Sequence, residues 1–255
     1  MSKQPIYLAF STQKGGAGKT TLTVLIASYL HYVKGYDVAV IDCDFPQHSI
    51  AEMRDRDLKL ALEDDHYKRM AYEQFTRLKK KAYPVIESST GKAITDADHI
   101  TEQADFDIVF FDLPGTVNDP AVITALSNMD YIIAPISADR LVLESTLRYM
   151  LVINDVIKKT GVTTIKGTHL IWNMVDGREK SELYGVYEQV IAELGFDVLK
   201  TFIPNSLRFR RELTETHKGV FRSTLFPAER PLLKGSNIDT LADEILELLK
   251  LNENG

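Results

Sequence analysis

A glycine-rich stretch near the N-terminus, STQKGGAGKTT at residues 11–21, has the composition of a phosphate-binding loop. It follows a short apolar run and precedes a helical pattern, which is the strand-to-helix context that a P-loop requires. Glycines at positions 15, 16 and 18 lack a Cβ, so the backbone can approach an anion closely. The N–H groups of the loop and of the helix N-terminus then face the phosphates. The stretch therefore predicts a nucleotide phosphate site.

Two side chains of this loop have separate expected roles. Lys19 reaches the β- and γ-phosphates, and the hydroxyl of Thr20 ligates Mg²⁺. A simple glycine turn before a helix is the alternative, but it does not explain Gly-Lys-Thr at the junction of strand and helix. The nucleotide-binding residues predicted in the loop are Gly15, Gly16, Ala17, Gly18, Lys19, Thr20 and Thr21.

Carboxylates stand at the ends of two predicted buried strands. Asp42 ends the run 37–42, Asp44 follows two residues later, and Asp112 ends the run 108–112. The carboxyl edge of a parallel sheet is where α/β folds bind ligands. An apolar strand ending in aspartate beside the P-loop strand is typical of a Walker B motif, so Asp112 is expected to hold Mg²⁺ through water. A helix N-cap is the alternative for Asp44 alone.

The loop departs from the common pattern G-x-x-x-x-G-K-[ST], because Gln13 stands where the first glycine is expected. Its form, K-G-G-x-G-K-T, resembles the deviant Walker A motif of the ParA/MinD ATPases, with ParA-type partition proteins closest. The resemblance implies that Lys14 reaches across a nucleotide-sandwich dimer to the other subunit's phosphates. A second cation there neutralises charge as the γ-phosphoryl group leaves. The alternative is that Lys14 assists within its own chain.

The resemblance also implies roles for the acidic residues. Asp44 matches the aspartate that orients or activates the attacking water, and Asp42 matches the acid nearer the metal. Gly115 corresponds to a glycine near the γ-phosphate, although its turn is one residue shorter than the family's D-x-P-P-G. The expected catalytic residues are Lys14, Lys19 and Asp44. The expected Mg²⁺ site is formed by Thr20, Asp42 and Asp112, and the cofactors are ATP and Mg²⁺.

Two later segments resemble the family's adenine pocket. Asn173 ends an apolar strand, and a side-chain amide can donate and accept hydrogen bonds at once, as reading an adenine edge requires. Pro204 belongs to an Ile-Pro-Asn stretch similar to the family's I-P-R, whose backbone lines the base. Asn205 stands where the family has an arginine, so the role of that arginine is not assigned to this chain. A strand-end asparagine and a loop proline are also common without a ligand.

The densest basic cluster follows this segment and suggests non-specific DNA binding. Phosphate contacts of this kind depend on salt and ignore sequence. A solvated helix, its charge offset by Glu212 and Glu215, is the alternative. The resemblance to partition ATPases favours DNA contact by Arg208, Arg210, Arg211, Lys218 and Arg222.

The resemblance implies a ParA-type ATPase that dimerises with ATP, binds DNA and positions or segregates a plasmid, a conjugative element or a chromosome. A partner protein would stimulate its hydrolysis, which is slow without the partner. A MinD-like or cargo-positioning ATPase without DNA binding is one alternative, although the acidic C-terminal helix argues against membrane docking. A P-loop metabolic ligase of related fold is another, but it would not need Lys14. Cys43, the single cysteine, excludes an electron-transfer ATPase that needs two cysteines per subunit.

The elements that position these residues form an α/β pattern. Apolar runs alternate with helical stretches, which predicts a mostly parallel, twisted sheet flanked by helices in the three-layer P-loop NTPase fold. We expect one domain, 1–255, with a helical insertion at about 54–100. With a net charge of −6, the protein as a whole has no positive field that would attract nucleic acid. No apolar run reaches membrane-spanning length and no signal peptide is visible, so a cytoplasmic protein, associated with the nucleoid if it binds DNA, is expected.

The predicted elements have definite boundaries. The expected strands are Ile6–Ser11, Asp37–Asp42, Ile108–Asp112, Tyr131–Ile136, Thr168–Asn173 and Val198–Phe202. The expected helices are Lys19–Val33, Pro120–Ser127, Leu143–Lys159, Ser181–Leu194 and Ile238–Leu249.

Overall fold

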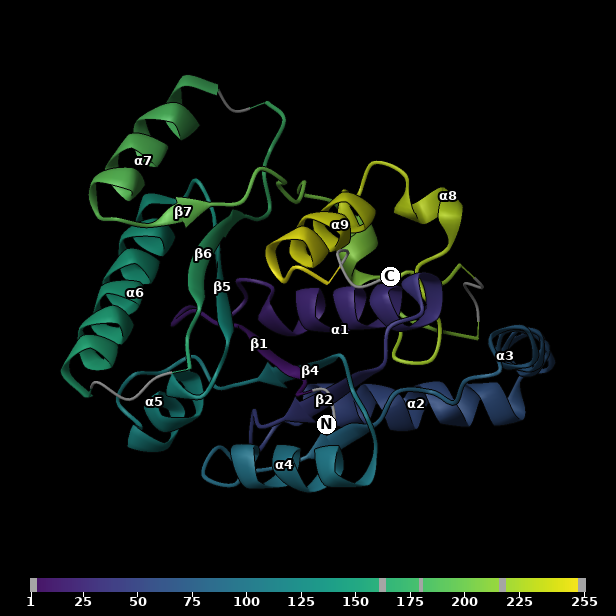
Figure 1. Ribbon diagram of the computed structural model, residues 1–255. Helices are drawn as coiled ribbons and strands as arrows, with labels where there is room; N and C mark the ends of the chain where they lie inside the picture. Colours follow the sequence, from purple (N-terminus) through teal and green to yellow (C-terminus); the bar gives the residue numbers. More distant parts are fainter. Residues whose placement is uncertain (1–3, 161–163, 179–180, 216–218, 252–255) are drawn as a thin grey trace.

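A seven-stranded sheet forms the centre of the protein (Figure 1). The computed structural model describes residues 4–160, 164–178, 181–215 and 219–251. All paired strands are parallel, and their order is β3-β2-β4-β1-β5-β6-β7. The strands are β1 (Ile6–Phe10), β2 (Val38–Asp42), β3 (Val85–Glu87), β4 (Ile108–Asp112), β5 (Tyr131–Ile136), β6 (Gly167–Trp172) and β7 (Asp197–Val198).

Helices cover both faces of this sheet, so the predicted three-layer α/β fold is confirmed (Figure 1). The described α-helices are α1 (Lys19–Tyr29), α2 (Ser49–Glu63), α3 (Asp65–Leu78), α4 (Ala93–Gln103), α5 (Pro120–Ser127), α6 (Arg140–Thr160), α7 (Ser181–Glu193), α8 (Arg230–Leu233) and α9 (Ile238–Leu248). A π-helical turn, Leu30–Lys34, continues α1, and a 3₁₀ turn covers Leu207–Arg210. Within the described residues, no helix combines the length and the apolar character needed to cross a membrane.

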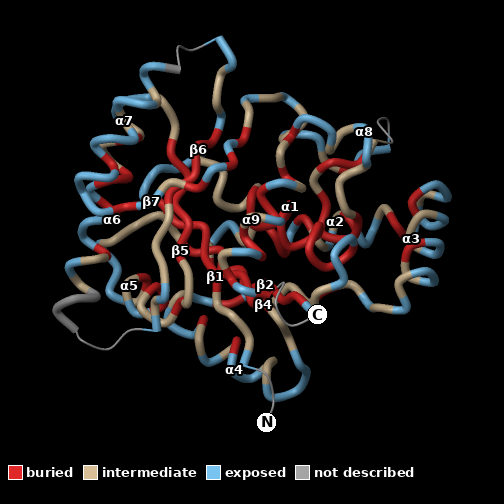
Figure 2. The backbone as a smooth tube through the Cα atoms, turned by 45° about the horizontal axis from the view of Figure 1, so that its top comes forward, coloured by how far each residue is buried: buried red, intermediate tan, exposed pale blue. Residues whose placement is uncertain are grey.

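The two-residue period of each strand divides the core between the two faces of the sheet. Leu8 and Phe10 of β1 and Phe110 of β4 pack with α1 and α9, whereas Ala9 and Phe111 pack with α4, α5 and α6. Both faces are therefore apolar, which is why these strands read as continuous hydrophobic runs in the sequence. Figure 2 shows the buried residues gathered along the strands and on the inner sides of the helices.

The position of β1 in the sheet determines where a ligand can bind. It pairs with β4 on one side and with β5 on the other, so the loop that leaves its carboxyl end lies at a switch point of the sheet. The glycine-rich loop occupies this place and leads into α1. Gly18 precedes the helix with φ +94°, a left-handed conformation that a residue with a Cβ rarely adopts. The sheet thus presents the loop at the edge where ligands bind in α/β folds.

The segment 54–100 contains a strand as well as helices. It holds most of α2, then α3, β3 and most of α4, and β3 pairs with β2 at one edge of the sheet. The sequence predicted a mostly helical crossover and missed this three-residue strand. A small third core joins α2 and α3 to the C-terminal region, and its buried members include Tyr67, Leu225 and Phe226. The segment therefore supports a part of the chain that lies far away in the sequence.

Candidate nucleotide site

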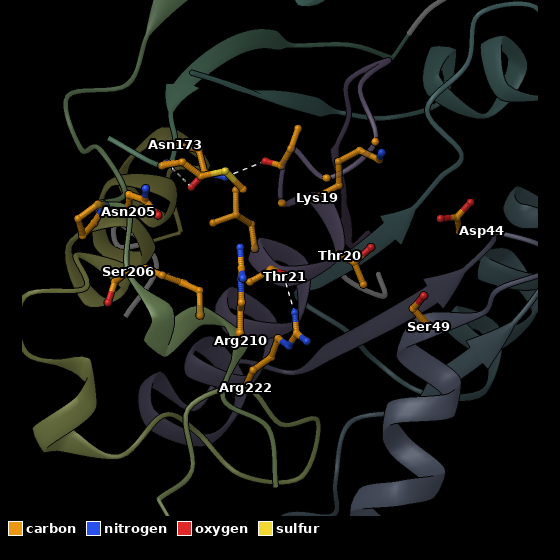
Figure 3. A pocket seen from close by; sticks show the side chains of 18 of the residues that line it. Lys19, Thr20, Thr21, Asp44, Ser49, Asn173, Asn205, Ser206, Arg210 and Arg222 are labelled. Atoms are coloured by element: carbon orange, nitrogen blue, oxygen red, sulfur yellow. Dashed lines mark hydrogen bonds between the residues drawn. The ribbon is translucent and has the colours of Figure 1, made fainter. Parts of the chain in front are cut away.

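A pocket of about 430 Å³ opens where the glycine-rich loop meets α1 (Figure 3). Its walls come from the β1–α1 loop, from the loop between β2 and α2, from the end of β6 and from the C-terminal region. The residues that line it are Gly15–Leu22, Asp44, Gln47, Ser49, Asn173, Met174, Pro204, Asn205, Ser206, Phe209, Arg210 and Arg222. Every predicted nucleotide-binding residue is in this set.

Thr20 and Asp112 are in contact at one end of the site. The Thr20 hydroxyl donates to Asp112 Oδ2 at 2.7 Å, while Oδ1 of Asp112 is buried and has no hydrogen-bond partner among the described residues. Burial raises the pKa of Asp112 to about 7, and the hydrogen bond from Thr20 partly opposes this effect. The unpartnered oxygen of Asp112 and the neighbouring hydroxyl of Thr20 are two oxygen ligands of the kind that Mg²⁺ prefers.

The metal site would depend on few protein ligands. No group of three or more His, Cys, Asp and Glu side chains that could hold a metal occurs in the described ranges. Thr20 and Asp112 fit a Mg²⁺ ion that keeps most of its waters and takes its other ligands from phosphate oxygens. When bound, the ion would neutralise charge on the β- and γ-phosphates.

Asp42 has a different role in the structure from the one expected. Its Oδ2 accepts the N–H groups of Ile50 at 2.9 Å and Ala51 at 3.0 Å, so it satisfies the first turn of α2. It is fully buried, burial raises its pKa, and it does not line the pocket. Asp42 therefore fits the start of α2 better than a metal shell.

Asp44 extends from the loop between β2 and α2 toward the phosphate end of the pocket. It is half-buried, and Figure 3 shows it on the same side as Lys19 and Thr20. Its backbone carbonyl accepts the N–H groups of Gln47 and His48, which holds the loop in a tight turn. Ser49, at the start of α2, lies beside it and also lines the pocket. Sequence reasoning missed Ser49, since a lone serine carries no signal before the fold is known.

Lys14 is placed apart from Lys19. It is exposed and lines a separate hollow of about 80 Å³, whereas Lys19 lines the main pocket. Gly15, Gly16 and Ala17 border both cavities. The glycine-rich loop therefore carries one lysine toward its own pocket and presents the other on its outer side.

Gly115 lies directly against the phosphate loop. A Cβ built on it would be 2.6 Å from the Thr12 carbonyl oxygen and 3.1 Å from Lys19 Nζ. Only a glycine allows the two backbones to approach this closely. The turn after β4 thus reaches the lysine end of the site, although it is one residue shorter than the family pattern.

Asn173 joins the end of β6 to the phosphate loop. Its Nδ2 donates to the Ala17 carbonyl at 2.7 Å, and its Oδ1 accepts the Met174 N–H at 2.9 Å. It is buried, and it lies at the end of the pocket opposite Asp44, together with Asn205 (Figure 3). The amide thus fixes the loop, and Pro204 also lines the pocket. Both polar atoms of the Asn173 side chain have backbone partners, so its contact with an adenine edge stays a prediction.

The predicted DNA-binding residues do not share one surface. Arg210 and Arg222 line the pocket, while Arg208 donates through Nη1 to the carbonyls of Leu232 at 2.8 Å and Lys234 at 2.7 Å. Arg211 is exposed. The remaining residue of the set, Lys218, lies outside the described residues.

The fold and this site define the class of protein. A parallel α/β sheet carries a Gly-Lys-Thr loop at its switch point, and the loop hydroxyl contacts an aspartate at the end of the adjacent strand. These are the features of a P-loop nucleotide-binding protein.

Comparison with known proteins identifies the family. The model of the CobQ/CobB/MinD/ParA nucleotide-binding domain (CbiA) matches residues 8–218. The chain therefore belongs to this family, which includes the ParA/MinD ATPases. An uncharacterized protein of Borreliella burgdorferi is 40% identical over 81 residues, which make up 31% of this chain and 32% of that protein. The match thus spans about a third of that relative.

Solved structures share the fold. A protein assigned to plasmid partition in Borrelia burgdorferi B31, bound to AMPPNP, superposes with a TM-score of 0.60 at 17% identity, over 98% of this chain and 100% of that one. The cell division ATPase MinD of Pyrococcus furiosus gives a TM-score of 0.61 at 20% identity, over 96% and 100% of the two chains. At these identities the likeness concerns the fold.

Proposed function

We propose that the protein is a ParA-type ATPase that forms an ATP-dependent sandwich dimer, binds DNA non-specifically and segregates or positions DNA. The DNA would be a plasmid, a conjugative element or a chromosome, and a partner protein would stimulate hydrolysis. ATP and Mg²⁺ are its cofactors, its intrinsic turnover is slow, and it acts in the cytoplasm on the nucleoid. Family membership supports the ATPase activity, and the plasmid partition protein of the same fold, bound to AMPPNP, supports the choice within the family.

The observation that carries the proposal is the position of Lys14. It is exposed on the outer side of the loop and does not line the nucleotide pocket of its own chain. A cation in this position is available to the phosphates of a second copy that faces the loop. Hydrolysis would then require the dimer, because each site receives a positive charge from the other subunit. A metabolic ligase of the same family would have no use for this lysine.

Lys14→Ala is expected to lower ATP hydrolysis about 100-fold or more, and to leave the affinity for ATP within about threefold of wild type. The reason is that Lys14 would stabilise charge only in the transition state, while Lys19 binds the ground state. Single-turnover hydrolysis and nucleotide titration measure the two quantities separately. Lys92→Ala, at an exposed lysine before α4, is the matched control. An equal loss of binding and hydrolysis would assign Lys14 to its own chain.

Fewer of the predicted DNA-binding arginines are available to contact DNA than the sequence suggested. Arg208 is engaged with backbone carbonyls, and Arg222 points into the pocket, so both are less available to phosphates of DNA. Arg210 is exposed and lines the pocket, whereas Arg211 is exposed and is not part of the pocket lining. This distribution is the specific observation in favour of the second candidate, a MinD-like or cargo-positioning ATPase that does not bind DNA.

DNA retention with ATP, with ADP and without nucleotide separates the two candidates. We expect retention with ATP only, and we expect it to weaken steeply as salt increases. Arg211→Glu should reduce it severalfold, whereas Arg69→Glu, at an exposed arginine on α3, serves as the control. ATP-dependent dimers that retain no DNA would favour the second candidate.

A further inference from the structure

The nucleotide pocket contains a cation that the phosphate-loop motif does not supply. Arg222 lies 201 residues beyond Thr21 in the chain, yet its Nη1 donates to the Thr21 hydroxyl at 2.8 Å. Thr21 follows Thr20, the predicted metal ligand, in the first turn of α1. The guanidinium is therefore held at the wall of the phosphate site, within the pocket (Figure 3).

The chain around Arg222 is fixed by buried polar contacts. Asp57 of α2 is fully buried, and its Oδ2 accepts the hydroxyl of Ser223 at 2.9 Å and both the N–H, at 2.7 Å, and the hydroxyl, at 3.0 Å, of Thr224. Ser28 of α1 and Tyr32 of the π-helical turn that continues it donate to the carbonyls of Ser223 and Thr224, respectively. The backbone that carries Arg222 is thus tied to both α1 and α2, which pre-organises the guanidinium.

The side chain of Arg222 is oriented by an acidic partner but is not saturated by it. Nη2 donates to Glu212, whose other oxygen accepts Nη1 of Arg56 from α2. Two cations therefore share one carboxylate. The Nε of Arg222 is buried and has no hydrogen-bond partner in the part of the chain that the structure describes. Each terminal nitrogen of the guanidinium carries two hydrogens and uses one of them in these bonds, so Nη1, beside Thr21, keeps an N–H that is suited to bind a phosphate oxygen.

The position of Arg222 along the pocket indicates which phosphate group of a bound nucleotide would lie nearest to it. Lys19, Thr20 and Asp44 lie toward one end, and Asn173 and Asn205 lie toward the other (Figure 3). Thr21 and the two arginines of the pocket lie between these ends. The first end would take the β- and γ-phosphates and the second the base, so the middle corresponds to the α-phosphate.

We propose that Arg222 binds the α-phosphate of the nucleotide, and that Glu212 and Arg56 hold its guanidinium in position. This inference rests on the proposed nucleotide site. It assigns Arg222 to nucleotide binding, whereas the sequence suggested that Arg222 contacts DNA. Arg210 lines the same wall, but it is exposed and contributes less because water screens its charge. Helix α2, most of which lies in the segment 54–100, acquires a role, since it supplies both Asp57 and Arg56.

The test compares the affinities of variants for ADP and for a non-hydrolysable ATP analogue, with Mg²⁺, by titration calorimetry. Arg222→Gln is expected to weaken both by roughly 10- to 100-fold and by similar factors, because both nucleotides carry the α-phosphate. Arg222→Lys should be intermediate, since it keeps the charge without the planar fork. Arg69→Gln, on the exposed face of α3, should bind like wild type.

Glu212→Gln distinguishes binding from a structural role. Glu212 orients the guanidinium without touching the phosphate, and a glutamine oxygen can still accept an N–H of Arg222, so Glu212→Gln should weaken nucleotide binding by a few-fold at most, less than Arg222→Gln does. A loss similar to that of Arg222→Gln would mean that the pair only supports the fold and would overturn the proposal. So would unchanged affinity in Arg222→Gln, and a loss confined to the ATP analogue would refute the α-phosphate assignment.

Two controls keep the result interpretable. Melting of each variant without nucleotide verifies folding, and if Arg222→Gln does not fold, Arg222→Lys and Glu212→Gln carry the test. A wild-type protein that binds neither nucleotide would refute the proposed ATPase function itself. Wild-type binding together with unchanged binding by Arg222→Gln would refute only the role of Arg222.

Discussion

Asp44→Ala is expected to reduce ATP hydrolysis about 100-fold or more while nucleotide affinity stays within about threefold of wild type. Asp44 is half-buried and lines the pocket at its phosphate end, so its carboxylate can orient an attacking water. It is not a ligand of the ground-state phosphates, because a carboxylate and a phosphate repel each other. Binding should therefore survive when the side chain is removed.

The consequence for assembly should be large. If hydrolysis ends the dimer, Asp44→Ala accumulates as an ATP-bound dimer, while wild type returns to monomer as ATP is consumed. Size-exclusion chromatography with light scattering, in ATP and in ADP, measures this directly. Asp55→Ala removes an exposed carboxylate from α2 and should behave like wild type. Wild-type turnover in Asp44→Ala, or a monomer in saturating ATP, would exclude the water-positioning role.

The fold was predictable because the central strands are buried on both faces. Their continuous apolar runs gave exact boundaries for β4 and β5, and the helix predicted at Pro120–Ser127 coincides with α5. Short edge strands carry too few residues for such a signal. Hence β3 was missed, and the last strand was predicted as Val198–Phe202 but spans Asp197–Val198. The sequence also placed the start of α6 at Leu143, three residues late, because the cap at Asp139 was overlooked.

The candidate site was predictable where it is local in sequence. Gly-Lys-Thr after a strand fixes the phosphate loop, and an aspartate that ends the neighbouring strand lies beside it. Contacts between distant segments carry no such pattern. Asn173 with Ala17 and Arg222 with Thr21 are joined only by the fold.

The basic residues at positions 208–222 illustrate a further limit. Charges that are close in sequence share a face only in a regular helix or strand, and this segment is mostly irregular. Its arginines therefore have different surroundings. Arg210 and Arg222 line the pocket, Arg208 donates to carbonyls at the end of α8, and Arg211 is exposed to solvent.

Asp112→Asn should stabilise the nucleotide-free protein at pH 8 and weaken its Mg²⁺-dependent nucleotide binding. The carboxyl is fully buried, and burial raises its pKa from 3.8 to about 7. Between these values the unfolded chain has lost the proton and the folded chain keeps it. Wild-type stability should therefore fall as pH rises from about 4 to about 7, and the cost stays constant above that range.

Asparagine cannot ionise, so it removes this cost and still accepts the Thr20 hydroxyl. The difference in pKa sets an upper limit of roughly 4 kcal/mol for the gain at pH 8, with little gain near pH 4. Urea unfolding in EDTA from pH 4 to pH 8 measures it, with Asp105→Asn, an exposed aspartate, as the control. The same variant should lose the extra affinity for ATP that Mg²⁺ provides, because a neutral amide is a poor ligand for that ion. A variant that is less stable than wild type at pH 8, or that keeps the full Mg²⁺ effect, would show that Asp112 serves the fold and not the metal.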